Sequence, residues 1–266
     1  MHLTDIGANL SHESFTHDLD AVIDAARAAG VSRILVTGTD RDSSEAALKL
    51  SQAYPDLFRS TAGYHPHVAD SFDDAALATL RELYSRPEVV AVGETGLDFN
   101  RSFSSRESQL RAFEQQLELA VETGLPLFLH QRDAHQEFIE LLRRYRQRVA
   151  GGVVHCFTDN RQALEDCLAQ DMYIGVTGWI CDERRGQELQ ELVSLIPSDR
   201  LLLETDAPYL LPRTLVPKPK TRRNEPKYLV EVLKTVAECC DRPPEQVARE
   251  TSDNAARLFK LPPIAG

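Results

Sequence analysis

The chain has 266 residues, of which 42% are hydrophobic and 27% are charged, and its formal net charge is −11. This acidic balance argues against broad binding of polyanions, and the apolar runs are far shorter than the roughly 18 residues that a membrane helix needs. With no signal-peptide pattern at its start and a length that suits one α/β barrel, the chain is expected to be a cytoplasmic monomer with one domain over residues 1–266.

Short apolar runs alternate with amphipathic helical patterns along the whole chain. The runs predict strands near residues 3–9, 33–38, 58–65, 89–94, 126–131, 152–157, 173–178 and 201–206. In the intervals, residues such as Leu19, Val22 and Ile23 follow helical spacing. Gly30 and Gly124 stand where a left-handed helix cap is expected. Eight such strand and helix units predict an α/β fold, a (β/α)8 TIM barrel.

The competing fold is an open doubly wound sheet. That fold would be favoured by a glycine-rich phosphate-binding turn after the first strand, and the segment from Asp5 to Asn9 has only one glycine, Gly7. The polar residues of interest follow the fourth, fifth, sixth and eighth predicted strands. Because a barrel brings the carboxyl ends of all its strands around one opening, it explains their convergence better than an open sheet.

Four residues with metal-binding side chains each end one of these apolar runs: Glu94, His130, His155 and Asp206. One histidine on a strand is usually an ordinary core residue, but four such residues at the same end of four strands indicate a site. Burying the carboxylates together without a cation would cost several kcal/mol each. Two imidazoles and two carboxylates suit Mg²⁺, Mn²⁺ or Zn²⁺.

The alternation of side chains along a strand extends this group. It places Glu204 on the same face as Asp206, so both carboxylates are expected to face the opening of the barrel. It also groups His65 with Gly63 on one face of the third strand. Pro66 is expected to end that strand and to leave His67 on the following loop.

Six motifs resemble those of the TatD-type metal-dependent deoxyribonucleases, and the match runs from Asp5 to Phe259. The motifs lie at residues 63–67, 93–98, 130–134, 155–158, 204–209 and 223–226. The resemblance implies a barrel of the metal-dependent hydrolase type that cuts phosphodiester bonds. The expected activity is a 3′ to 5′ exonuclease on single-stranded DNA ends, extending to RNA, with a role in DNA repair or degradation.

The resemblance also implies roles for individual residues. Glu94, His130 and His155 would bind the metal, and Asp206 would be both a ligand and the group that orients or deprotonates the attacking water. Glu204, the neighbour of Asp206 on the same face, is a further catalytic candidate. The expected substrate contacts are His65, which is also a catalytic candidate, together with His67, Arg132 and Arg223.

The chain departs from the family at the end of its first strand. Most members carry His-x-His there, whereas this chain has Gly7, Ala8 and Asn9. Glycine has no ligand atom, and asparagine offers only a neutral oxygen. We therefore expect one firmly bound ion, with a second recruited only by substrate phosphate, and a preference for Mg²⁺ or Mn²⁺ over Zn²⁺.

Two further features are open to more than one interpretation. The basic segment at residues 218–223 follows the last strand and would either cradle a nucleic-acid backbone or form a solvated loop. Phe99, Trp179 and Tyr209 also follow predicted strands, and each would either stack on an unpaired base or pack within the loops.

Two other functions stay open at this stage. The same kind of barrel hydrolyses other esters and amides, including the aminoacyl ester at an RNA 3′ end. Such enzymes typically keep both histidines of the first strand and a bridging carboxylated lysine, where this chain has Gly7, Asn9 and Glu94. The third reading is a barrel that binds a metal without catalysis.

Overall fold

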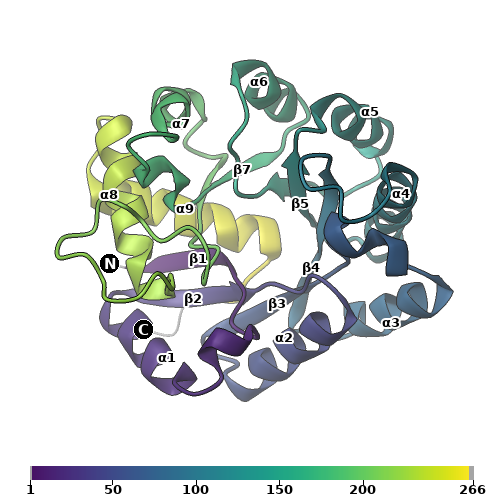
Figure 1. Ribbon diagram of the computed structural model, residues 1–266, viewed down its shortest axis with the longest axis horizontal. Helices are drawn as coiled ribbons and strands as arrows, with labels where there is room; N and C mark the ends of the chain where they lie inside the picture. The colour runs from purple at the N-terminus through teal and green to yellow at the C-terminus, as the bar shows by residue number, and fades with distance from the viewer. Residues whose placement is uncertain (1, 264–266) are drawn as a thin grey trace.

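The structure, a computed structural model, describes residues 2–263. Within these residues, eight parallel strands form one sheet in the order of the chain, and helices surround it (Figure 1). The strands are β1 (Leu3–Ala8), β2 (Val31–Val36), β3 (Phe58–Ala62), β4 (Val89–Asp98), β5 (Leu127–Arg132), β6 (Gly152–Val154), β7 (Tyr173–Val176) and β8 (Leu201–Leu203). The predicted (β/α)8 barrel is confirmed.

The helices occupy the intervals that the apolar spacing predicts. The α-helices are α1 (Leu19–Ala28), α2 (Arg41–Ala53), α3 (Asp74–Tyr84), α4 (Arg106–Thr123), α5 (His135–Tyr145), α6 (Arg161–Ala169), α7 (Gln187–Leu192), α8 (Leu229–Cys239) and α9 (Pro244–Phe259). Short 3-10 helices are η1 (Glu13–Phe15), η2 (Pro66–Ser71), η3 (Gly178–Cys181), η4 (Val193–Leu195) and η5 (Pro226–Tyr228). Gly30 and Gly124 have φ angles of 89° and 68°, as expected of left-handed caps. No helix in residues 2–263 is both long and apolar enough to cross a membrane.

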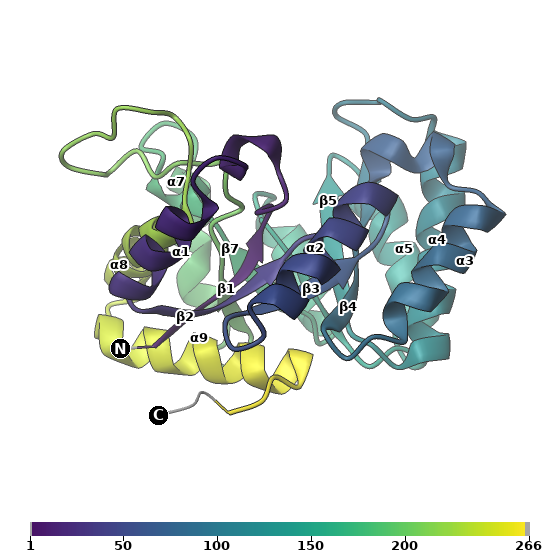
Figure 2. The same cartoon turned by 90° about the horizontal axis from the view of Figure 1, so that it is seen from below.

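Apolar side chains fill the interior of the barrel and close one of its ends. Inward-facing residues such as Ile6, Leu35 and Phe128 form a buried cluster that also includes Leu258 and Phe259 of α9. Helix α9 lies across the amino ends of the strands, as Figure 2 shows. The carboxyl ends therefore form the open end of the barrel, which is where this fold places its functional loops.

The barrel closes between its first and last strands through a buried carboxylate. Asp5 accepts hydrogen bonds from the Thr205 backbone N–H at 2.9 Å and from the Thr205 hydroxyl at 2.5 Å. Burial raises the pKa of Asp5 to about 7, although these hydrogen bonds act in the opposite direction. Beyond this point the Asp206 N–H donates to the Gly7 carbonyl at 2.8 Å. The closure thus fixes the backbone on which Asp206 stands.

All eight strands end one to four residues from their predicted ends, and the differences at β4 and β8 change the placement of site residues. Strand β4 continues to Asp98, four residues past the predicted end at 94, because its pairing with β5 resumes after an irregularity that follows Val92. Gly93 makes that irregularity sterically feasible, since a Cβ there would lie 2.1 Å from the Phe128 carbonyl oxygen. Strand β8 ends at Leu203, so Glu204 and Asp206 do not continue its alternation.

Candidate active site

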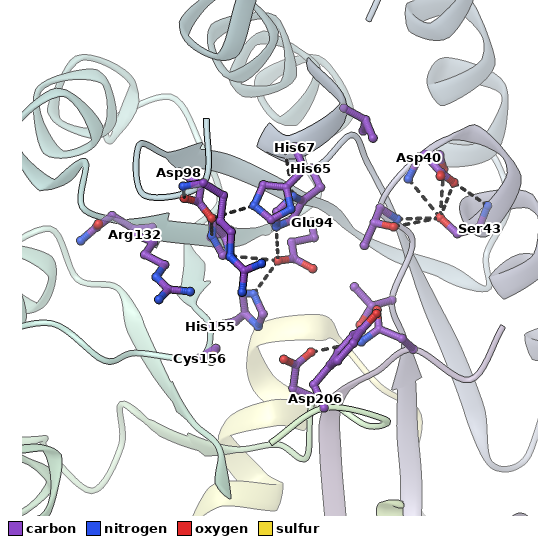
Figure 3. A pocket seen from close by; sticks show the side chains of 18 of the residues that line it. Asp40, Ser43, His65, His67, Glu94, Asp98, Arg132, His155, Cys156 and Asp206 are labelled. Atoms are coloured by element: carbon purple, nitrogen blue, oxygen red, sulfur yellow. Dashed lines mark hydrogen bonds and ion pairs between the residues drawn. The ribbon is translucent and has the colours of Figure 1, made fainter. Parts of the chain in front are cut away.

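A large cavity opens at the carboxyl ends of the strands, with a volume of about 1170 Å³ (Figure 3). It contains most of the site residues predicted from the sequence. Those that line it are His65, His67, Glu94, His130, Arg132, His155 and Asp206. The other two predicted residues, Glu204 and Arg223, are not among its lining residues.

Three imidazoles converge on one carboxylate oxygen at the centre of this cavity. Oε1 of Glu94 lies 3.2 Å from Nε2 of His65, 3.1 Å from Nδ1 of His130 and 2.7 Å from Nε2 of His155. Glu94 is only 5% exposed. Burial by itself would raise the pKa of Glu94, but the facing imidazoles hold it well below its ordinary value. Donor atoms of His65, Glu94 and His130 lie within 4.8 Å of one another, a spacing that suits one cation.

His155 is oriented from behind by Glu204. Its Nδ1 lies 3.2 Å from Oε2 of Glu204, while the other Glu204 oxygen accepts the Cys156 N–H at 2.6 Å. Burial by itself would lower the pKa of His155, but Glu94 and Glu204 raise it well above its usual value. With Nδ1–H committed to Glu204, Nε2 is the ring nitrogen that faces the centre, and it can bind a cation once it has lost its proton, as in many metal-binding histidines.

His65 has the opposite tautomer. Its Nδ1 accepts the His67 backbone N–H at 3.0 Å, so the neutral ring carries its proton on Nε2, the atom that faces Glu94. Burial lowers the pKa of His65 to about 4, which keeps the ring neutral. A nitrogen that carries a proton binds a cation only after it loses that proton. In this tautomer His65 is a hydrogen-bond donor toward the centre of the site, and its contact with substrate stays a prediction.

Asp98 is a site residue that the sequence reasoning missed. Its Oδ2 lies 2.8 Å from Nε2 of His67 and 3.2 Å from Nε2 of His130. Burial by itself would raise the pKa of Asp98, but hydrogen bonds from these two rings hold it well below its ordinary value. Because His130 donates through Nε2, its Nδ1 faces Glu94 and the cation position. Glu94, Gly96 and Asp98 are two residues apart and share one face of β4. A predicted fourth strand that continued to Asp98 would have shown this residue beside Glu94.

Asp206 stands across the cavity from Glu94 (Figure 3). Its backbone is in the left-handed region, with φ at 55°, and this conformation turns the side chain out of the path of β8. The Asn9 side-chain amide donates to Oδ1 of Asp206 at 3.1 Å. Burial raises the pKa of Asp206 to about 8. His155 acts against this shift, and the nearby carboxylates Glu94 and Glu204 add to it. Asn9 therefore orients the Asp206 carboxylate through its side-chain N–H. An N–H group cannot act as a metal ligand.

Gly7 leaves room for Glu204. A Cβ at position 7 would lie 2.5 Å from Oε2 of Glu204 and 3.0 Å from the Phe128 ring. Glu204 is fully buried, so the expectation that it faces the opening beside Asp206 was wrong. The physical reason is that β8 ends before Glu204, and the carboxylate instead enters the corner left by the missing side chain of the first strand.

The two predicted arginines have different surroundings. Arg132 is exposed and lines the cavity, where it is available to an anionic substrate. Arg223 instead pairs with Asp18 at 2.7 Å and with Glu225 at 3.0 Å, and it donates to the Ser14 carbonyl. These contacts connect the loop after β8 to the start of α1. The substrate-binding role of Arg223 stays a prediction, and the structure places the residue outside the cavity lining.

A (β/α)8 barrel that gathers carboxylates and imidazoles at the carboxyl ends of its strands is the architecture of a metal-dependent hydrolase. A family model described as TatD related DNase matches residues 4–260. The chain belongs to this family.

Relatives and solved structures agree with that assignment. The chain is 52% identical over 257 residues to a protein of Erwinia tasmaniensis named 3′-5′ ssDNA/RNA exonuclease TatD, covering 97% of this chain and 99% of that protein. A Pectobacterium carotovorum protein of the same name is 51% identical, with the same coverage. The crystal structure of the TatD homologue YJJV from Escherichia coli superposes with a TM-score of 0.89 at 29% identity, covering 98% of each chain. A TatD-family hydrolase of Entamoeba histolytica also gives 0.89, at 26% identity, covering 97% of this chain and 98% of that one.

We predict that Asp98→Asn weakens divalent cation binding by about 10- to 100-fold. The asparagine amide has no negative charge, so it holds the His67 and His130 rings less strongly than the carboxylate that accepts their hydrogen bonds. Calorimetric titration with Mn²⁺ measures this effect. Asp70→Asn is the matched control, since exposed Asp70 bonds to Ser105 and to neither of these rings. Wild-type affinity in Asp98→Asn would show that His130 needs no such support.

We predict that Gly7→Ala displaces Glu204 from His155 and thereby lowers both stability, by about 1–3 kcal/mol, and cation affinity. Thermal unfolding and Mn²⁺ titration measure the two effects. Gly124→Ala separates them: its left-handed backbone is strained by a side chain, but nothing lies within 4 Å of the added Cβ. That control should lose stability alone. Unchanged cation affinity in Gly7→Ala would contradict the role given to Glu204.

Proposed function

We propose that the protein is a metal-dependent nuclease that removes nucleotides from the 3′ ends of single-stranded DNA and RNA. The observation that carries this proposal is the convergence of His65, His130 and His155 on Glu94 at the floor of an open cavity. The names of the relatives support the substrate and the direction of cleavage. Exposed Arg132 on the cavity wall supports an anionic substrate.

The donor set fits one divalent cation. Glu94, His130 and His155 would hold it, with Asp206 as the fourth protein ligand facing them from across the cavity. When bound, such an ion acts as a Lewis acid toward water and toward a phosphoryl oxygen. The mixture of nitrogen and oxygen donors, with no thiolate among these four, favours Mg²⁺ or Mn²⁺ and also admits Zn²⁺.

The protein side chains supply positioning and proton transfer. Asp206, held by Asn9, is the carboxylate placed to orient a water molecule and to take its proton. His65 presents Nε2–H toward the same centre and would donate to a non-bridging oxygen of the phosphate. His67 lies beside it, with one ring nitrogen committed to Asp98. Glu204 acts through His155 and is a positioning residue in this scheme.

We further propose that the free protein binds one ion firmly and that substrate phosphate recruits any second ion. Support comes from the first strand, where Glu204 occupies the space beside Gly7 and Asn9 directs its amide N–H toward Asp206. Neither position of the strand 1 motif thus offers a strong ligand atom.

The proposed activity predicts a ladder of products from a 5′-labelled single-stranded oligonucleotide, DNA or RNA, in the presence of Mg²⁺ or Mn²⁺. Chelator should abolish the ladder, and Glu94→Gln should reduce the rate by at least about 100-fold, since it removes the central charge. Gel electrophoresis of timed samples measures the result. Equal degradation by wild type and Glu94→Gln would refute the proposal, and cleavage of an aminoacyl ester with intact phosphodiester bonds would favour the alternative hydrolase.

Cation binding should be strongly pH dependent. Asp98 and Glu94 raise the pKa of His130, and Glu94 and Glu204 raise the pKa of His155, both against the opposing effect of burial, so a cation must displace protons from these rings. Affinity should therefore rise with pH between about pH 6 and about pH 8, by up to about tenfold per unit for each displaced proton. Calorimetric titration with Mn²⁺ should give about one ion per chain. Two tightly bound ions in the free protein, or affinity that falls with pH, would contradict this scheme.

A further inference from the structure

Phe103 exposes a large apolar ring beside the active site. It lies in the loop between β4 and α4, is 63% exposed and lines the same cavity as Glu94. Burying a phenyl ring is more favourable than leaving it in water. An exposed ring at the edge of a functional cavity therefore indicates a surface that a ligand covers. Neither the sequence motifs nor the comparisons assign it a role.

The ring is available on at least one face. Its contact with the His67 ring is T-shaped, with the centroids 4.9 Å apart and the planes at 76°, and such a contact covers one face at most. Two of the three aromatic residues predicted from the sequence are covered on one face. The Arg106 guanidinium carbon lies 4.3 Å from the centre of the Phe99 ring, and that of Arg185 lies 4.4 Å from the centre of the Trp179 ring. The third, Tyr209, is 52% exposed, lines the same cavity and makes a T-shaped contact with His12, with the ring centroids 5.9 Å apart.

The loop that carries Phe103 is fixed to the catalytic residues. Ser104 donates through its hydroxyl to the His67 carbonyl at 2.9 Å and accepts the Asp70 N–H at 3.1 Å. The Arg101 N–H donates to Oδ1 of Asp98 at 3.0 Å. The chain on either side of Phe103 is thus tied to His67 and Asp98, and the phenyl ring contacts the His67 ring. A substrate whose phosphate reaches His67 would therefore place a neighbouring base near the phenyl ring.

We propose that Phe103 is the stacking platform for an unpaired nucleobase next to the phosphate that is cleaved, and that it thereby favours single strands. This inference rests on the proposed nuclease function. Every base has a flat π-face, so stacking tolerates any sequence. In a duplex, each internal base already stacks on its neighbours and pairs across the helix, which denies this face to the protein. Arg101 and Arg132, which line the same cavity, offer positive charge for the backbone.

Equilibrium binding tests the platform independently of hydrolysis. A single-stranded oligodeoxynucleotide with 2-aminopurine near its 3′ end is titrated with protein in the presence of chelator. Stacking on Phe103 should quench the 2-aminopurine fluorescence.

Four variants separate the aromatic face from other properties of the side chain. Phe103→Ala should abolish the quench and weaken binding by roughly 5- to 100-fold, whereas Phe103→Tyr should keep the quench and the affinity. Phe103→Leu keeps an apolar side chain without an aromatic face and should behave like Phe103→Ala. Leu195→Ala, at an exposed position outside the cavity lining, should match wild type.

An abasic substitution makes the test specific. With a 3′-terminal segment that lacks bases, wild type and Phe103→Ala should bind equally weakly. Equal loss on base-containing and abasic strands, a Phe103→Leu variant that binds like wild type, or no wild-type binding at all would each overturn the inference. A wild type that quenches 2-aminopurine yet yields no cleavage products with Mg²⁺ would uphold the platform and refute the nuclease function. In the active enzyme, the loss in Phe103→Ala should appear as a raised KM with little change in kcat.

Discussion

The site depends on a buried carboxylate that cannot remain charged without partners. Glu94 is 5% exposed and lies within 3.2 Å of three imidazole nitrogens. An isolated carboxylate in this position would take up a proton, because removal from water costs it several kcal/mol. The facing imidazoles hold its pKa well below the ordinary value, and the carboxylates that face His130 and His155 raise the pKa values of those rings. A cation binds such rings only by displacing their protons, so proton binding and cation binding would compete at this site.

The two imidazole rings proposed as metal ligands, those of His130 and His155, are each held by a second carboxylate. Glu204 orients His155 and Asp98 orients His130, and each leaves one ring nitrogen directed toward the centre. His65 differs because a backbone N–H, not a carboxylate, meets its Nδ1. The partner behind each ring thus decides its chemistry: a carboxylate prepares a ligand, whereas a backbone donor prepares a hydrogen-bond donor. Three imidazoles and three carboxylates acquire separate roles in this way: His65, His130, His155, Glu94, Asp98 and Glu204.

The sequence was sufficient for the barrel and for the meeting of Glu94, His130, His155 and Asp206 in the cavity, because hydrophobic spacing follows simple periodic rules. The family resemblance, not the spacing, singled out His67 and Arg132. The spacing failed where the backbone leaves those rules. Asp98 was missed because β4 continues past the irregularity at Gly93, and Glu204 was misdirected because β8 ends one residue before it. Phe103 lies in a loop, where exposure depends on tertiary contacts that no local pattern records. Arg223 lies in a family motif, yet its ion pairs depend on residues near the start of the chain.

The first strand shows why a missing ligand need not leave a weaker site. A side chain at position 7 and the Glu204 carboxylate cannot both occupy the same corner, since they would approach within 2.5 Å. A histidine there would offer the cation a direct ligand but would displace the carboxylate that orients His155. With glycine, that corner contributes charge and orientation through His155, and Asn9 contributes orientation through Asp206. In the proposed metal-binding scheme, the departure from the family pattern would therefore exchange direct ligands for positioning groups and concentrate cation binding on fewer side chains.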